Sequence, residues 1–257
     1  MSIQFNGSSQ YITAASAAGI PTVYPLAVCC IVNLAALATW HGLFQVGNGS
    51  DGAGNGYYIE ITSSNTIQFQ IAAGNSAGSI TTGTVVSGDW LFIGCAAASA
   101  ASRRILCYNY ETRATILNET FTDSKTIVAP AARFRLGAWG DTDTTFTDLL
   151  NGTMAWCAVY NIDLTIQSGA ALLNVALLGP FAGATPTNLW PLWEGTGTTA
   201  RDLVSGNAGT LTGSPTWEPM SLPGPWWARA ARRVIRPQAA APPAVIPYLV
   251  VAPYRPF

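Results

Sequence analysis

Short apolar runs separated by turn residues dominate the chain from Met1 to about Ser221. Clusters of Gly, Ser, Asn and Asp divide the runs, and helix signals are scarce. This pattern is typical of an antiparallel β domain. Two stacked sheets are expected, because a single sheet of this size would leave an apolar face in water. The predicted strands are Ile3–Phe5, Tyr11–Thr13, Leu26–Asn33, Gly42–Val46, Tyr57–Thr62, Thr66–Ala72, Trp90–Ala97, Arg104–Tyr110, Phe134–Leu136 and Gly152–Tyr160.

Two segments carry sharper local predictions. Alternating apolar and polar residues in Tyr57–Thr62 and Ile67–Ile71, joined through Ser63–Asn65, predict a β-hairpin with one solvated face. The segment Leu164–Leu178 has a helical pattern, which Gly179 and the following proline are expected to end.

The longest apolar stretch, Leu26–Trp40, does not predict a membrane span. It is shorter than the roughly 20 apolar residues that a spanning helix needs, and Asn33 interrupts it. The chain enters strand-like sequence at Ser2 without a basic or apolar leader, so no Sec-type signal peptide is predicted and synthesis is expected in the cytoplasm. The odd number of cysteines, with no C-x-x-C pair, predicts small core residues, although Cys95 and Cys107 flank a predicted hairpin and leave a bridge open.

The sequence changes character near Leu222. Half of the 16 prolines lie from Pro223 onward, and proline at this density favours an extended, polyproline-like backbone. We therefore predict a β-sandwich over residues 1–221, in which residues 188–217 add edge strands, and an extended C-terminal arm over residues 222–257.

Charge also divides the chain at this point. No acidic residue follows Glu218, whereas five arginines do, so the arm carries +5 and the remainder −6. An extended arm has little surface of its own to offset ordering costs of about 1–2 kcal/mol per residue, so its anchors are expected to bury against a body. Apolar residues between the arginines favour a protein partner over nucleic acid. The predicted partner-binding residues are Trp226, Trp227, Arg229, Arg232, Arg233, Arg236, Tyr248, Tyr254 and Phe257.

Several segments, taken in order, resemble a known module. The run Ile3–Ile12 (IQFNGSSQYI) is similar to an opening F-D-G-x-x-D-Y-V strand and turn, Asp89–Ile93 to an x-W-x-x-V/I strand, and Asn151–Asn161 to a closing strand that ends in Tyr-Asn. Together they resemble the concanavalin A-like, laminin G-like jelly roll found in bacterial and phage surface proteins. The segment Leu192–Asp202 resembles the strand that normally precedes this module, so it is interpreted as a permuted edge strand.

The resemblance implies architecture first, because one fold hosts many functions. With the low charge content and the arm, it favours a non-enzymatic virion protein, such as a phage capsid decoration or cement protein or a head- or tail-fibre-associated subunit. Its partners would be other virion proteins, the major capsid protein or its own copies in a homo-oligomer. The alternative is a lectin-like module that binds host-surface glycans.

The sequence patterns of catalytic, metal and sugar sites bear on the choice between these functions. The sequence lacks the pattern of paired carboxylates that a glycosidase on this fold would need. A Ser-His-Asp or Cys-His site would have to use His41, the only histidine, and no catalytic residue is assigned. No cofactor or metal is assigned, although Asp141, Asp143 and Asp148 leave a calcium loop as an alternative to a solvated acidic turn. Two loop aromatics, Trp40 and Trp139, are the candidates for stacking on a sugar ring.

Overall fold

The computed structural model describes residues 1–14, 18–47, 55–73, 76–127, 133–140, 146–166, 169–182 and 184–219. The predicted arm with its nine partner-binding residues lies outside these residues, and so do Asp141 and Asp143. The boundary between sandwich and arm stays a prediction.

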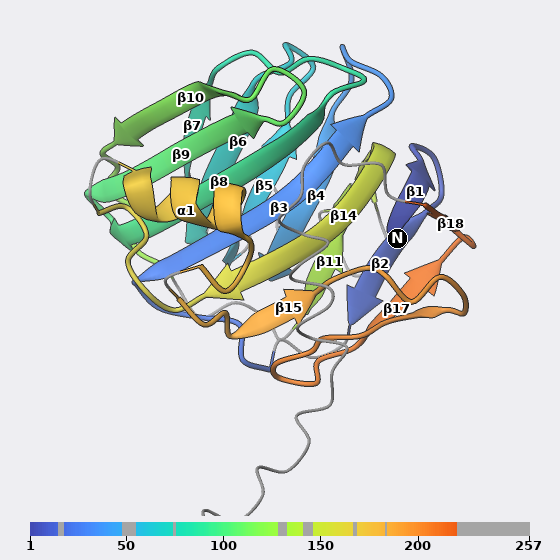
Figure 1. The fold of residues 1–257 in the computed structure, drawn as a ribbon. Coiled ribbons are helices and arrows are strands. Elements are labelled where there is room, and N and C mark those ends of the chain that lie inside the picture. Colours follow the sequence, from blue (N-terminus) through green and yellow to red (C-terminus); the bar gives the residue numbers. More distant parts are fainter. Residues whose placement is uncertain are drawn as a thin grey trace, which may run out of the picture. The chain divides into compact units, whose positions relative to one another are not determined.

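The described residues form an all-β sandwich of two antiparallel sheets (Figure 1). The first, sheet I, has the strand order β10-β9-β8-β3-β14-β1-β18, and β15 pairs with β14 beside this path. Its strands are β1 (Ser2–Asn6), β3 (Leu26–Leu34), β8 (Trp90–Ser99), β9 (Ser102–Asn109), β10 (Ala114–Phe121), β14 (Asn151–Tyr160), β15 (Asn188–Trp190) and β18 (Thr216–Glu218).

The second, sheet II, has the order β16-β17-β2-β11-β4-β5-β6-β7. Its strands are β2 (Tyr11–Ala14), β4 (His41–Gly47), β5 (Gly56–Ile61), β6 (Ile67–Ala73), β7 (Ser76–Thr82), β11 (Phe134–Leu136), β16 (Thr199–Ala200) and β17 (Gly209–Thr212). A separate two-stranded ladder joins β12 (Ala138–Trp139) to β13 (Asp148–Leu149).

All ten predicted strands are present, and their ends agree with the prediction within two residues. Strands β15 to β18 add to both sheets: β17 pairs with β2 in sheet II, while β15 pairs with β14 and β18 pairs with β1 in sheet I. The strands β7 and β10 were not predicted. The buried apolar residues between the sheets form one core, to which β3 and β8 in sheet I and β5 and β6 in sheet II contribute alternate side chains.

The single helix of the described residues, α1 (Ala170–Leu178), covers the outer face of sheet I over β8 and β9 (Figure 1). It ends at Gly179 as predicted, and Leu172, Val175 and Ala176 are buried. The predicted start at Leu164 is wrong. Asp163 Oδ1 accepts hydrogen bonds from the Thr165 amide and hydroxyl, which holds this segment in a side-chain-stabilised turn instead of a first helical turn.

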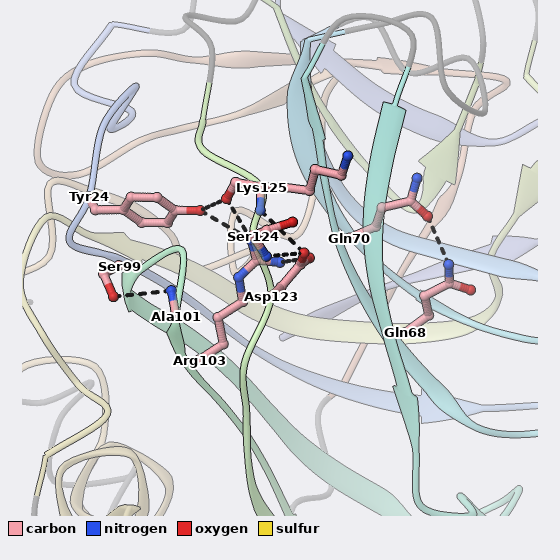
Figure 2. Close-up of polar contacts among 9 residues, drawn as sticks. All are labelled: Tyr24, Gln68, Gln70, Ser99, Ala101, Arg103, Asp123, Ser124 and Lys125. Carbon is pink, nitrogen blue, oxygen red and sulfur yellow. Dashed lines mark hydrogen bonds and ion pairs between the residues drawn. The ribbon is translucent and has the colours of Figure 1, made fainter.

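The predicted β5–β6 hairpin is present, with Ile61 opposite Ile67, but its predicted solvated face is buried. Tyr58 is 2% exposed and lies against Trp139, with ring centroids 5.7 Å apart. Gln68 Nε2 donates to Gln70 Oε1 at 2.8 Å, so two of the polar side chains on this face hydrogen-bond each other, as Figure 2 shows. The alternation identified the strands correctly but did not reveal what covers them.

The connection after β10 is held against sheet I by a buried ion pair (Figure 2). Arg103 in β9 is fully buried, and its Nη1 lies 2.8 Å from Asp123 Oδ2. Its Nη2 donates to the Lys125 carbonyl at 2.8 Å, and the Tyr24 hydroxyl donates to the same oxygen at 2.7 Å. This network fixes the segment that leads from sheet I toward sheet II.

All five cysteines are buried and free, in agreement with their predicted place in the core. Cys95 faces Ile105 and Cys107 faces Ile93 across the β8–β9 pair, so the two cysteines are not directly opposite each other. Burial raises the pKa of the Cys30 thiol to about 12, which keeps it uncharged and unreactive at neutral pH. No helix within the described residues is long and apolar enough to cross a membrane.

Candidate functional site

A hollow of about 490 Å³ surrounds the exposed tryptophan of the β3–β4 loop. Trp40 is 41% exposed and lies in this hollow. The other walls come from the turn after β1, the β5–β6 turn, the β13 strand and the start of β14. The remaining lining residues are Gly7, Ala36, Ala38, Thr39, His41, Ser63, Thr147, Asp148, Leu149 and Asn151.

The loop that carries Trp40 is fixed by its neighbour in sheet II. Ala38 adopts a left-handed backbone conformation with φ 64°, and its amide donates to Asn65 Oδ1 at 2.7 Å. Asn65 itself has φ 64° in the β5–β6 turn, a conformation that asparagine tolerates better than most residues. The hairpin turn therefore positions the tryptophan loop.

His41 connects the β3–β4 loop with β14 on the buried side of the hollow. It is 1% exposed, its Nδ1 accepts from the Asn151 amide at 3.3 Å, and its Nε2 lies 3.1 Å from the Ala36 carbonyl. Nδ1 also lies 3.4 Å from the Leu149 carbonyl and Nε2 lies 3.1 Å from the Thr39 hydroxyl, so both ring nitrogens have partners inside the protein. Burial lowers the pKa of His41, which favours the neutral ring. The histidine acts as a brace between the β3–β4 loop and β14.

The structure places the second predicted sugar-stacking residue elsewhere. Trp139 is only 7% exposed, and its ring packs on Tyr58 of β5. Its backbone pairs with Asp148 in the β12–β13 ladder, yet its side chain does not line the hollow around Trp40. The two tryptophans are thus not brought together.

Asp148 is the one member of the predicted acidic trio that the structure describes. It lies on β13 and lines the hollow. Among the described residues, no group of three or more His, Cys, Asp or Glu side chains is placed to hold a metal ion.

A second, smaller hollow of about 190 Å³ lies beside β2 and β11. Arg135 is 2% exposed, and its Nη1 donates to Gln45 Oε1 at 2.7 Å and to the Gly47 carbonyl at 3.2 Å. Its guanidinium carbon lies 5.2 Å from the centre of the Phe146 ring, which also stacks on Tyr11 with centroids 4.1 Å apart. The sequence analysis did not predict this site, because strand alternation does not show that an arginine within a strand is buried and paired.

The sequence analysis also missed most of the groups around Trp40. Thr39, Ser63 and Asn151 come from three different segments, and no motif links them. One signal in the sequence pointed to this site. Trp40 lies at the end of a loop, directly before a predicted strand, and at such a position a large aromatic side chain is expected to be exposed to solvent.

No protein-family model matches the chain, and no curated protein matches it in sequence. Solved structures match it in fold. A candidate carbohydrate-binding protein from Bacteroides ovatus superposes with a TM-score of 0.55 at 12% identity, covering 84% of this chain and 58% of that protein. The chain therefore spans less than two thirds of that protein's length.

Two further similar structures are a binding module and a phage protein. The CBM40 module of the Ruminococcus gnavus IT-sialidase, bound to α2,3-sialyllactose, gives a TM-score of 0.50 at 12% identity and covers 66% of this chain and 95% of the module. Tailspike protein 2 of an Escherichia coli O157:H7 bacteriophage gives 0.49 at 12% identity and covers 70% and 24%. At these identities the likeness concerns the fold alone, and it confirms the predicted jelly-roll sandwich.

Proposed function

We propose that the sandwich is a carbohydrate-binding module whose ligand lies in the hollow around Trp40. The observation that carries this proposal is a 41% exposed tryptophan set in a hollow of about 490 Å³ among hydroxyl, amide and carboxylate side chains. Sugar sites combine an aromatic surface for the ring with a few polar groups that fix its orientation. Two of the matched structures, with TM-scores of 0.55 and 0.50, are a candidate carbohydrate-binding protein and a carbohydrate-binding module, which supports this role.

The proposed role is binding without hydrolysis. Glycosidases place two carboxyl groups about 5–10 Å apart across the scissile bond. Among the described residues that line the hollow, Asp148 is the only carboxylate. A glycan held here would meet one acidic group and no second carboxylate from those residues, so no release of reducing ends is expected when the full chain is incubated with its ligand.

The test is a glycan array probed with the full chain and with Trp40→Ala. Loss of the stacking surface should weaken binding at least tenfold, which corresponds to about 1.4 kcal/mol. Phe181→Ala is the matched control, because Phe181 is 48% exposed in the turn after α1 and does not line the hollow. An array on which the unaltered chain binds nothing, with and without calcium, would overturn the proposal.

A second candidate role concerns assembly into a virion. The supporting observation is in the sequence: residues 222–257 hold eight prolines, five arginines and no acidic residue, and they follow a domain of opposite net charge. We propose that this arm binds a neighbouring virion subunit. Deletion of residues 222–257 should abolish incorporation into particles while the sandwich stays folded, and normal assembly of the truncated chain would contradict this role.

A further inference from the structure

We infer that the hollow around Trp40 selects neutral glycans over glycans that carry sialic acid, uronic acid or sulfate. This inference rests on the proposed glycan-binding function and adds the class of ligand. Among the described residues that line the hollow, the only charged side chain is Asp148, and no lysine or arginine is present. The other polar side chains there are the neutral Thr39, Ser63, Thr147 and Asn151 and the buried His41.

An anionic sugar would meet no lysine or arginine among the described residues that line this hollow. Proteins recognise carboxylate and sulfate groups chiefly through arginine and lysine, which form charge-assisted hydrogen bonds with them. The arginines of the smaller hollow, Arg133 and Arg135, line a different site. His41 does not replace them, because its two ring nitrogens lie against Ala36 and Asn151 inside the protein. A negative group near Asp148 would instead meet a negative charge.

The charge of the whole domain acts in the same direction. Residues 1–221 hold seven basic and thirteen acidic side chains, a net charge of −6. A field of this sign around the sandwich lowers the local concentration of anionic ligands, and residues 222–257 add +5, which brings the full chain to −1. The charge of residues 1–221 follows from the sequence and does not depend on the geometry of the hollow.

A neutral sugar, in contrast, matches the groups present. Its apolar ring face fits the exposed surface of Trp40, and its hydroxyl groups are donors for the carboxylate of Asp148. A carboxylate has about four acceptor positions, so it can receive a sugar hydroxyl in addition to bonds within the protein. The hydroxyls of Thr39 and Ser63 and the amide of Asn151 can each donate and accept, as hydroxyl-rich ligands require.

The decisive experiment compares matched pairs of glycans on one array. Each pair consists of a neutral oligosaccharide, such as lactose or N-acetyllactosamine, and the same oligosaccharide capped with sialic acid or sulfate. We expect the full chain to bind the neutral member at least tenfold more tightly. Asp148→Asn should reduce this preference to threefold or less, whereas Glu111→Gln, which removes one negative charge from the exposed β9–β10 turn outside the hollow, should leave it nearly unchanged.

The outcomes separate this inference from the function on which it rests. Tighter, Trp40-dependent binding of the capped glycans would overturn the selectivity but keep glycan binding. An Asp148→Asn chain that discriminates as strongly as the unaltered chain would also overturn it. Binding to neither member of any pair would overturn the proposed function itself, and the selectivity with it.

Discussion

The hollow around Trp40 and the hollow beside Phe146 are both built from an aromatic ring and polar side chains, but they use these groups in opposite ways. Trp40 is 41% exposed, whereas the Phe146 ring contacts both Tyr11 and the guanidinium of Arg135. The larger hollow is lined by a carboxylate, and the smaller one by two arginines. An aromatic ring that is packed against other side chains contributes to the stability of the fold. An aromatic ring that faces solvent can instead contact a ligand.

The same contrast holds for the polar groups. Arg135 donates to Gln45 and to the Gly47 carbonyl, and Gln45 also bonds to both backbone polar groups of Gly140. These bonds hold Gly140, which follows β12, against sheet II. In the larger hollow, the hydrogen bonds of His41 are buried and brace its walls, and one of its partners is the Thr39 hydroxyl, whereas Ser63 is exposed to solvent. We therefore expect substitutions in the smaller hollow to change folding, and substitutions in the larger one to change binding.

The largest expected effect is from Arg135→Met. This change removes two charge-assisted hydrogen bonds, each worth about 1.5–3 kcal/mol when buried, and the contact with Phe146. The free energy of unfolding should fall by about 3 kcal/mol, measured by urea denaturation. Glycan affinity should change less than twofold at a temperature where the variant is folded. A loss below about 1 kcal/mol would show that the two hollows do not differ in this way.

A smaller effect is expected at the glycine that lies against the backbone of both β12 and β13. A Cβ on Gly42 would lie 2.2 Å from the Trp139 amide nitrogen and 2.8 Å from the Asp148 carbonyl oxygen, so the β12–β13 ladder must shift. Gly42→Ala should cost about 2 kcal/mol, within the usual range for overpacking, and should also weaken glycan binding because Asp148 moves.

The control for Gly42 is Gly88→Ala. Gly88 has φ 84°, but no atom lies within 4 Å of the position that a Cβ would take, so its substitution costs only backbone strain of about 1 kcal/mol. Binding should be unchanged in this variant. If both alanine variants bind glycan as well as the unaltered chain does, the position of Asp148 does not matter for the ligand.

The strands that sequence reasoning found and missed differ in composition. The runs that became β3, β5 and β8 are rich in apolar residues, and their burial is sufficient to identify them. Strand β7 (SAGSITT) contains small and polar residues, and β10 (ATILNETF) has mostly exposed side chains. Such strands form because an edge of a neighbouring strand is available for hydrogen bonding, which is a property of the assembled sheet and not of the local sequence.

The site was predictable only in part for the same reason. Trp40 and Trp139 have similar surroundings in sequence, since each lies in a connection close to the end of a predicted strand. Their different exposure depends on whether a partner from another strand is present, and Tyr58 supplies that partner only to Trp139. The sequence could nominate both tryptophans, but only the fold could separate them.

The smallest expected effect is the pH dependence of the free energy of unfolding, which tests the role of His41 under the larger hollow. His41 is the only histidine, and burial lowers its pKa in the folded protein below the value of about 6.5 that it has when unfolded. As the pH falls below about 6.5, the unfolded chain takes up a proton that the folded chain resists, so the free energy of unfolding decreases. Above that pH both states are neutral and this dependence vanishes.

Urea denaturation between about pH 5 and 7.5 measures this effect, and His41→Gln is the matched variant, because glutamine keeps a donor and an acceptor but does not titrate. The variant should be less stable at the upper end of this range, where the ring is replaced by a poorer fit between Ala36 and Asn151, and its stability should be flatter below about pH 6.5. Glycan binding by the unaltered chain should weaken over the same interval if protonation turns the acceptor facing the Asn151 amide into a donor and loosens the wall of the hollow. Equal slopes in the two proteins would mean that His41 does not brace the Trp40 loop against β14.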